Sequence, residues 1–142
     1  MSSQRSFSVE VISPQRVVYR SSDVVSLIAP GVEGYFGIMA NHAPLIAQLG
    51  IGVLTLREAD GKVVRIAVNN GFLEVSKNRV TIVCDTAERG DEIDVERARS
   101  AYERAVKRLL DIGNLSIDRD RARRAKARAI ARLKAAGVLI EQ

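Results

Sequence analysis

The 142-residue sequence contains one cysteine, Cys84, and one histidine, His42. A lone cysteine cannot form an internal disulfide or, by itself, a cysteine-based metal site. His42 has no second histidine or suitably spaced cysteine as a co-ligand, and the sequence identifies no nucleophile or orienting acid for it. We therefore expect neither a metal site nor general-base catalysis at His42. No catalytic constellation is found elsewhere, so the chain is not expected to be an enzyme.

Long apolar runs are also missing. No stretch approaches the ~20 apolar residues that a transmembrane helix needs. The first residues, MSSQRSFSVEV, pass directly into a strand pattern without a secretory signal. From these absences we expect a protein that is soluble or peripheral to a membrane, in a reducing compartment.

Proline is sparse, but two of the 3 prolines fall in one stretch together with three of the 10 glycines, PGVEGYFGIMANHAP, residues 30–44. Glycine is favoured where φ is positive or where backbones approach closely, and proline fixes φ. The stretch is therefore predicted to be a shaped loop with strand fragments, not a helix. It lacks the GxGxxG spacing of a dinucleotide fingerprint, and no Gly-Lys-Ser/Thr follows to make a phosphate-binding P-loop.

Short runs of alternating apolar and polar residues occupy the first 90 positions and predict strands. Ser22-Asp23 is interpreted as a polar break between two of them, Asp60-Gly61 as a type I′ hairpin turn, and Lys77-Asn78 as a weaker hairpin signal. Cys84, at the end of the last strand, is expected to be a small buried hydrophobe. The predicted strands cover residues 7–11, 17–21, 24–29, 52–57, 63–68, 72–75 and 79–84.

Near Gly90 the apolar period changes from two to helical. Two apolar stripes follow, separated by a helix stop signal at Gly113-Asn114, and the second stripe ends at Gly137. The stripes contain Ala98, Ala101, Ala105 and Leu109, then Ala122, Ala125, Ala129, Leu133 and Ala136. The predicted fold is therefore α+β in two parts, an antiparallel β-sandwich or flattened barrel over residues 1–90 and an antiparallel α-helical hairpin over residues 91–142. Because alanine buries little area, the hairpin is expected to be the less stable part.

Positive charge is unevenly distributed. The formal net charge is +5, and eight of the 22 basic residues lie between Arg119 and Lys134 with one acid, Asp120. Such a segment is a solvated face or docks on an acidic partner, nucleic acid or anionic lipid. The segment has no interleaved aromatic residues and no nucleic-acid motif, and an alanine stripe has too little apolar area to insert into a membrane. An acidic protein partner is therefore favoured over nucleic acid.

A short repeat marks both helix starts, Ile-Asp-x-x-Arg-Ala-Arg at residues 93–99 and again at 117–123. Aspartate is a preferred helix N-cap, because its carboxylate accepts a hydrogen bond from an otherwise unpaired N–H and suits the helix dipole. The repeat therefore predicts that Asp94 and Asp118 cap two helices.

Several blocks of the sequence are distinctive in combination. PGxxGxxGI at residues 30–38 precedes HAP at 42–44, and NGFLEV at 70–75 precedes VTIV at 80–83 and DTAE at 85–88. In this order they resemble the epsilon subunit of F-type ATP synthases, over a stretch from about Val9 to Leu133. Asn41 departs from the pattern, because many relatives carry glycine before the histidine, and this leaves the local turn open.

The resemblance implies a non-catalytic central-stalk subunit, with a sandwich that binds the gamma subunit and the c-ring and so couples proton flow to rotation. Its C-terminal helices would meet an acidic loop of the catalytic beta subunits and inhibit ATP hydrolysis, within a complex that also contains alpha subunits. The implied location is the cytoplasmic side of the bacterial plasma membrane, peripheral through the complex, with the stromal side of the thylakoid as the alternative. The residues implied to face the c-ring are Gly34, Tyr35, Gly37, Ile38 and His42.

A second resemblance concerns nucleotide binding. Ile93-Asp94-x-x-Arg97-Ala98 followed by Arg104 is similar to the first half of the ATP-binding motif of bacterial epsilon subunits, and Arg128 and Arg132 fall where its second half lies. By that resemblance Ile93 and Ala98 would border the adenosine, Asp94 would accept a hydrogen bond from it, and the four arginines would meet the triphosphate. Glu88 matches a further acidic position. No cofactor is expected to be required, and ATP is expected as a regulatory ligand.

Two other classes of function stay open at this point. One is a free-standing ATP-sensing protein, and the other, which is disfavoured, is a basic nucleic-acid-binding adaptor. Co-purification separates them, because nucleic acid would be lost steeply with salt.

Overall fold

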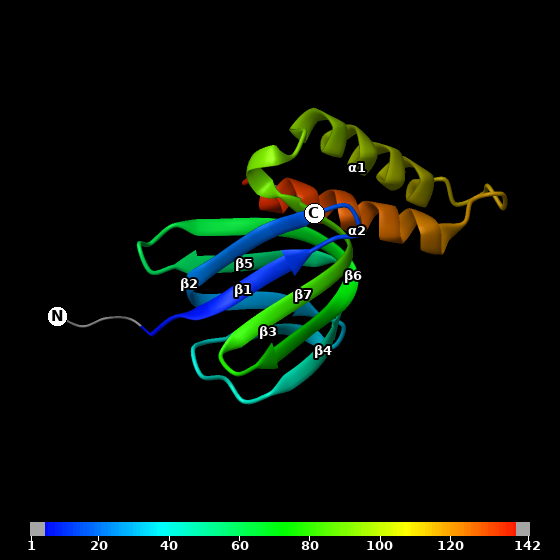
Figure 1. Ribbon diagram of the computed structural model, residues 1–142. Helices are drawn as coiled ribbons and strands as arrows, with labels where there is room; N and C mark the ends of the chain where they lie inside the picture. The colour runs from blue at the N-terminus through cyan, green and yellow to red at the C-terminus, as the bar shows by residue number, and fades with distance from the viewer. Residues whose placement is uncertain (1–4, 139–142) are drawn as a thin grey trace.

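The computed structural model describes residues 5–138 and contains a seven-stranded sheet folded on itself, with a two-helix hairpin on one face (Figure 1). The fold expected from the sequence is confirmed. The predicted ends of both parts include residues 1–4 and 139–142, which lie outside the described residues. The elements are β1 (Phe7–Ile12), β2 (Val17–Gly31), β3 (Gly34–Ile38), β4 (Leu45–Leu49), β5 (Gly52–Glu58), β6 (Val63–Ser76), β7 (Arg79–Arg89), a 3₁₀ turn (Gly90–Glu92), α1 (Val95–Leu110) and α2 (Arg119–Ala135).

The sheet closes because β1 pairs with both β2 and β7. The hydrogen-bonded path runs β1-β7-β6-β4-β2-β3, and β5 bridges β2 and β6. One pairing differs from the all-antiparallel expectation, since β1 and β7 run parallel. Alternate side chains of these strands point inward and form one apolar core, which includes Val9, Leu54, Ile66 and, as predicted, the buried Cys84.

Two strands are longer than the sequence pattern predicts. β2 continues through Ser22-Asp23, which was predicted to be a break. The ladder to β1 shifts register there, since Phe7 pairs with Val24 and Val9 with Ser21, so the polar pair forms a bulge instead of ending the strand. β6 likewise joins two predicted strands through Asn70, which has a φ of 48°. Each of these two strands pairs with different strands along its length. The local alternation of apolar and polar residues does not predict such long-range pairing.

The two predicted hairpin turns exist, but the type I′ turn predicted at Asp60-Gly61 is wrong and that geometry occurs at Lys77-Asn78. Gly61 has a φ of 93° while Asp60 is not among the residues with positive φ, and the Gly61 N–H donates to the Glu58 carbonyl, so this is not a type I′ turn. Lys77 and Asn78 have φ of 52° and 62°, which are the two positive values that a type I′ turn requires. The weaker sequence signal therefore marks the tighter turn.

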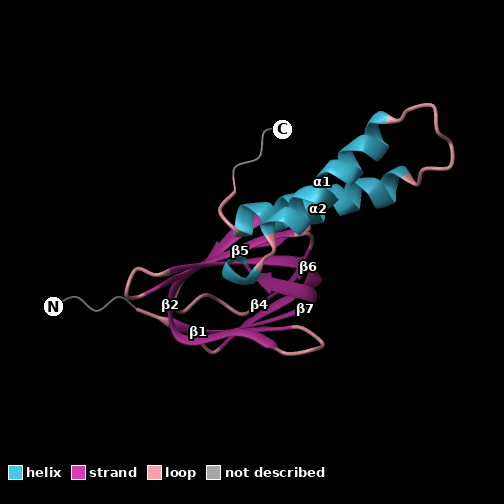
Figure 2. Ribbon diagram, turned by 90° about the horizontal axis from the view of Figure 1, so that it is seen from above, coloured by secondary structure: helices cyan, strands magenta, loops and turns pink. Residues whose placement is uncertain are grey.

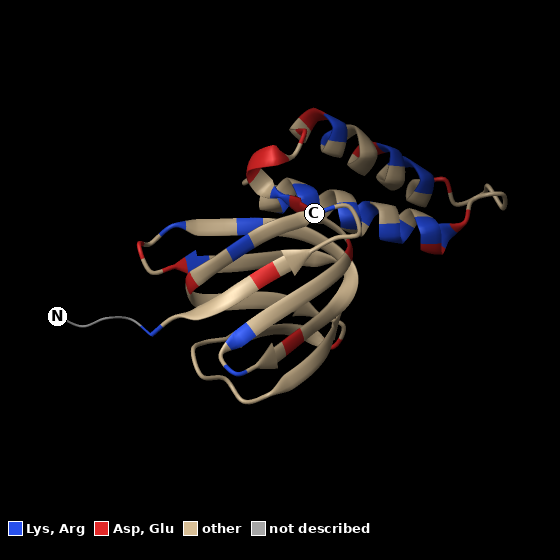
Figure 3. Cartoon of the chain, viewed as in Figure 1, with Lys and Arg blue, Asp and Glu red and all other residues tan. Residues whose placement is uncertain are grey.

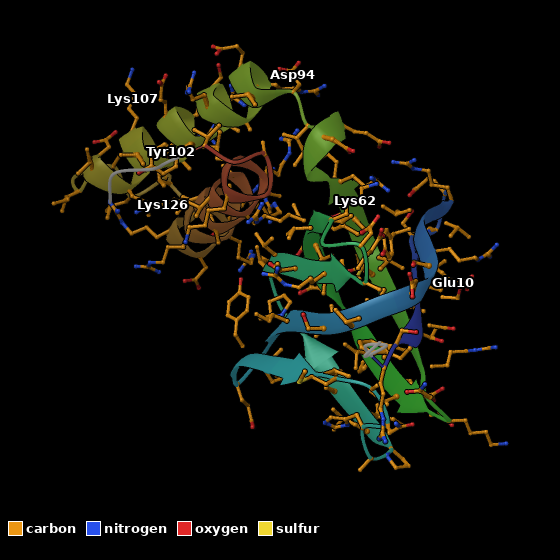
Figure 4. The ribbon with its side chains drawn as sticks, turned by 90° about the vertical axis from the view of Figure 1, so that its left-hand side faces the viewer. Glu10, Lys62, Asp94, Tyr102, Lys107 and Lys126 are labelled. Carbon is orange, nitrogen blue, oxygen red and sulfur yellow. The ribbon has the colours of Figure 1, made fainter. Side chains whose placement is uncertain are left out.

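The hairpin packs through its alanine stripes, with α2 between α1 and the sheet (Figures 1 and 2). Asp94 and Asp118 are the predicted N-caps, and their carboxylates accept from the Arg97 and Arg121 N–H at 3.1 and 3.0 Å. Figure 4 shows Asp94 at the start of α1 and Lys107 nearer its other end. α1 ends at Leu110, three residues before the predicted stop at Gly113.

A second apolar cluster holds α2 on the sheet. Ala131, Leu133 and Ala135 of α2 pack with Val53 of β5 and Ala67 of β6. These sheet residues lie on the outer face of the sandwich, so this cluster is distinct from the closed inner core. The contact is mostly alanine and buries little area per residue. The lower stability of the hairpin stays a prediction.

Candidate functional site

Arginines of both helices converge on a groove of about 440 Å³ beside β7. Alanines at i and i+4 positions form its apolar floor, because their small side chains let α1 and α2 approach closely. Arginines one turn apart on each helix project over that floor. We call this the arginine groove, and it is lined by Thr86, Glu88, Ala101, Arg104, Ala105, Arg108, Ala125, Arg128, Ala129 and Arg132.

The arginine groove carries four guanidinium groups and one carboxylate. Arg132 Nε donates to Glu88 Oε1 at 2.9 Å, and both side chains are partly exposed. Among the described residues no carboxylate pairs with Arg104, Arg108 or Arg128 within 4.0 Å. Figure 3 shows basic residues concentrated on the two helices. Guanidinium forks match phosphate oxygens, so the groove is chemically suited to a phosphorylated ligand.

Four of the eight residues predicted to bind nucleotide meet in this groove, namely Glu88, Arg104, Arg128 and Arg132. The other four do not line it. The side chains of Ile93 and Ala98 are buried in the α2–sheet cluster, the Asp94 carboxylate caps α1, and Arg97 is exposed outside the groove.

Two polar lining residues were missed by the sequence analysis, and the four lining alanines were predicted only as parts of the apolar stripes. Arg108 lies one turn after Arg104 on the same face of α1, and Thr86 lies two residues before Glu88 on the same face of β7. Helical and strand periodicity would have found both, once the groove face was known.

The junction between sandwich and hairpin is closed by several contacts besides Arg132–Glu88. Arg89 forms a two-bond ion pair with Asp91, and this hydrogen bonding lowers the pKa of the Asp91 carboxyl below its ordinary value and raises the pKa of Arg89. Arg16 of the loop before β2 pairs with Glu92 at 2.7 Å. A β-carbon at Gly90 would collide with the carbonyl of Ala135, so only glycine fits the observed packing of α2.

The residues predicted to face the c-ring are distributed along β3 and the loop after it. Gly34, Gly37 and Tyr35 are exposed, although the Tyr35 hydroxyl is tied back by the Val53 N–H at 3.1 Å. Ile38 is a correction, because its side chain is 1% exposed and lies in the inner core, where it does not face a partner. Its place on the surface is taken by Met39, which is 67% exposed.

His42 is partly buried in the loop between β3 and β4, and its Nδ1 lies 2.7 Å from the Ala43 carbonyl oxygen. No group of three or more potential metal-ligating side chains occurs within residues 5–138. In the same range no helix is long and apolar enough to cross a membrane.

Three exposed apolar side chains lie on the outside of the sandwich. Phe72 of β6 pairs with Val83 of β7, both are more than half exposed, and Ile46 of the neighbouring β4 is 71% exposed. We call these three residues the apolar strip. Sequence analysis overlooked it, although the alternation in β6 places Phe72 opposite to the buried Leu73 and Val75.

Both parts of the chain match known families. Residues 6–90 match the family described as ATP synthase, Delta/Epsilon chain, beta-sandwich domain, and residues 91–137 match ATP synthase, Delta/Epsilon chain, long alpha-helix domain. The ATP synthase epsilon chain of Symbiobacterium thermophilum is 47% identical over 132 residues, which cover 93% of this chain and 94% of that protein. That of Syntrophomonas wolfei is 48% identical over 106 residues, covering 75% and 77%.

Solved structures share the fold. A chain in the structure of the Euglena gracilis mitochondrial ATP synthase, OSCP/F1/c-ring, has a TM-score of 0.78 and 23% identity, covering 92% of this chain and 81% of its own length. A chain in the Tetrahymena thermophila mitochondrial ATP synthase, central stalk/c-ring, has a TM-score of 0.60 and 16% identity, covering 94% and 98%. The resemblance found in the sequence motifs is thus confirmed, and the chain belongs to the ATP synthase delta/epsilon chain family, together with the epsilon chains of F-type ATP synthases.

Proposed function

We propose that this chain is a non-catalytic rotor subunit of an F-type ATP synthase, in which the sandwich couples proton translocation to rotation and the hairpin regulates ATP hydrolysis. The family and the two-part fold support this role. We place it on the cytoplasmic side of a bacterial plasma membrane, attached through the complex. Its proposed partners are the gamma subunit, the c-ring and the alpha and beta subunits.

Two surfaces of the sandwich are suited to these partners. The apolar strip of Ile46, Phe72 and Val83 has the composition of an interface core, and we assign it to the gamma subunit. The loop from Met39 to Pro44 is largely exposed and lies away from the hairpin (Figure 1), and we assign it with the β3 surface to the polar loops of the c-ring.

The observation that carries the regulatory part of the proposal is the arginine groove, with three guanidinium groups that pair with no carboxylate in the described chain. A triphosphate in the groove would neutralise arginines contributed by both helices. It would therefore stabilise the docked hairpin over any arrangement in which the helices separate. Ligand at ~100 times its Kd would contribute about 2.7 kcal/mol to the docked form. Released helices would present the same arginines to an acidic loop of the beta subunits.

Calorimetric titration of ATP into the full chain tests the nucleotide site. The Arg128→Ala/Arg132→Ala variant should lose the binding heat, while Arg123→Ala/Arg124→Ala, which removes two charges from the same helix outside the groove, should retain it. Asp94→Ala separates the sequence motif from the groove, since Asp94 caps α1 and does not line the cavity. Absence of heat with wild-type protein at millimolar ATP would remove the nucleotide from the proposal.

Assembly with the synthase is tested independently of ATP. The tagged chain should capture the gamma subunit and the c-ring from detergent-solubilised membranes. It should also change ATP hydrolysis when added to synthase lacking this subunit. A free-standing ATP sensor would bind ATP but capture neither, and a nucleic-acid adaptor would capture nucleic acid in a salt-dependent manner.

A further inference from the structure

The loop between β3 and β4 is fastened to the β6–β7 turn by one side chain. Asn78 Oδ1 accepts a hydrogen bond from the Asn41 N–H at 2.7 Å, and Asn78 Nδ2 donates to the Ser6 carbonyl at 2.9 Å. The Ser8 N–H also donates to the Asn78 carbonyl at 3.2 Å. Asn78 therefore joins three segments that are distant in sequence, at the end of the sandwich that carries the proposed c-ring surface.

Both asparagines in this contact have left-handed backbones. Asn41 and Asn78 each have a φ of 62°. Asparagine tolerates this region better than most residues but still does not favour it as glycine does. An additional interaction at Asn41 therefore helps to keep this conformation. The 2.7 Å bond to Asn78 supplies that interaction at the backbone of Asn41 itself.

The backbone conformation of Asn41 determines where the side chains of its neighbours in the loop point. Met39 lies two residues before it and His42 directly after it, and both belong to the surface assigned to the c-ring. The loop receives no other side-chain hydrogen bond from outside itself among the described residues. Release of Asn41 would therefore free the backbone at the centre of this surface.

We propose that Asn78 is a positioning residue that holds the Met39–Pro44 loop in the conformation that binds the c-ring. The inference rests on the proposed function, because it assumes that this loop is a contact surface in the synthase. Asn78 acts through Asn41 and needs no contact of its own with the partner. Its effect is to lower the conformational entropy that the loop loses on binding.

Asn78→Gly tests the proposal with little disturbance of the turn. Glycine is favoured at the second central position of a type I′ turn, so the β6–β7 hairpin should be kept while the side-chain bonds are lost. Asn78→Asp keeps an acceptor for the Asn41 N–H but replaces the donor to Ser6 with an oxygen that repels the Ser6 carbonyl, so it disrupts only the Ser6 contact. Asn70→Gly is the matched control, since Asn70 also has positive φ and its side chain makes no hydrogen bond in the described structure.

Two quantities are measured for each variant: hydrogen exchange of the Asn41 amide in the isolated full chain, and affinity for detergent-solubilised synthase lacking this subunit. Asn78→Gly should deprotect the Asn41 amide and weaken binding by about 5- to 30-fold, the cost of ordering one residue. Asn78→Asp and Asn70→Gly should match the wild type in both measurements. If the melting temperature of Asn78→Gly is unchanged, the weaker binding results from loss of loop positioning and not from loss of folding.

An unchanged affinity for Asn78→Gly with a deprotected Asn41 amide would overturn the proposal. So would an amide that stays protected, because Asn78 would then not hold the loop. Met39→Glu distinguishes this failure from that of the proposed function. If Met39→Glu weakens binding while Asn78→Gly does not, the loop contacts the partner but Asn78 does not position it. If neither variant weakens binding, the assignment of the loop to the c-ring is wrong.

Discussion

Arg132 of α2 donates to Glu88 of β7 at 2.9 Å, and this ion pair joins the regulatory hairpin to the sandwich inside the arginine groove. The two side chains are 24% and 39% exposed, so solvent screens their attraction. The pair lies in the groove that is proposed to bind a phosphorylated ligand, and it contributes modestly to docking of the hairpin. Replacing Glu88 by a ligand phosphate as the partner of Arg132 would therefore cost little free energy.

The strength of this pair is measurable in a double-mutant cycle. Glu88→Gln and Arg132→Gln should show a coupling free energy of about 0.2–1 kcal/mol in chemical unfolding, in the range of partly exposed pairs. A coupling well above that range would mean that the pair is the main fastening of the hairpin. The pair Arg99–Glu96, on the exposed face of α1, is a suitable reference cycle.

Gly90→Ala should detach the hairpin. The added β-carbon would collide with the Ala135 carbonyl, and forcing extra atoms into a packed contact costs about 1–3 kcal/mol. Because the alanine contact behind it is weak, we expect faster hydrogen exchange throughout α2 with an unchanged sandwich. Gly113→Ala is the control, since nothing lies within 4 Å of its added carbon. Equal exchange in the two variants would show that α2 does not need the close approach at Gly90.

A fragment of residues 1–90 should fold by itself. The inner core is built from the strands alone, and the apolar sheet residues that pack against α2, such as Val53 and Ala67, lie on the outer face. We expect a cooperative thermal transition and retained capture of the gamma subunit. An unfolded fragment would show instead that the hairpin completes the sandwich.

Phe72→Ser should weaken assembly more than folding. Phe72 is 59% exposed, so removal of its side chain leaves no internal cavity. An aromatic residue at the centre of an interface often contributes 2 kcal/mol or more to binding, which is roughly a 30-fold change in affinity. Capture of the gamma subunit and the melting temperature give the two effects separately. Leu73→Ser, at the adjacent buried position, is the opposite control and should mainly lower stability. Normal capture by Phe72→Ser would exclude the apolar strip as the gamma contact.

Alkaline pH should destabilise the sandwich through Cys84. Burial raises the pKa of the Cys84 thiol to about 12 from an ordinary 9.0, so the thiol ionises in the unfolded chain first. The contribution of the neutral Cys84 thiol to the free energy of unfolding is therefore fully present below pH 9. It is lost as the pH rises toward 12, with a slope of at most about 1.36 kcal/mol per pH unit. Burial and a hydrogen bond to Glu58 also raise the pKa of Tyr19, which adds a loss at higher pH.

Urea titrations between pH 8 and 10 should therefore show a smaller decline for Cys84→Ala than for the wild type. Thiol reagents should modify Cys84 of the folded wild type slowly, because the residue is buried. Equal pH slopes in the two proteins would contradict the assigned cause.

Much of this protein follows from local sequence. Apolar residues recur with a period of two before Gly90 and with a period of about 3.6 after it, which separates the strands from the helices. The aspartates of the repeat cap both helices, as their hydrogen-bonding chemistry predicts. The motif blocks between Pro30 and Glu88 also identify the family. These features depend on residues close together in the chain.

Other features were decided only by tertiary structure. Ser22-Asp23 stays inside β2 because β1 and β5 pair with the strand on either side of it, and Ile38 turns inward because β3 pairs with β2, which sets Ile38 opposite the buried Leu27. The arginine groove forms only where α1, α2 and β7 meet. For this reason only four of the eight residues predicted to bind nucleotide line the groove, and the other four lie outside it. The contact between Asn41 and Asn78 spans 37 residues. Local propensity carries no information about such partners, because their free energy depends on groups brought together only by the folded sheet.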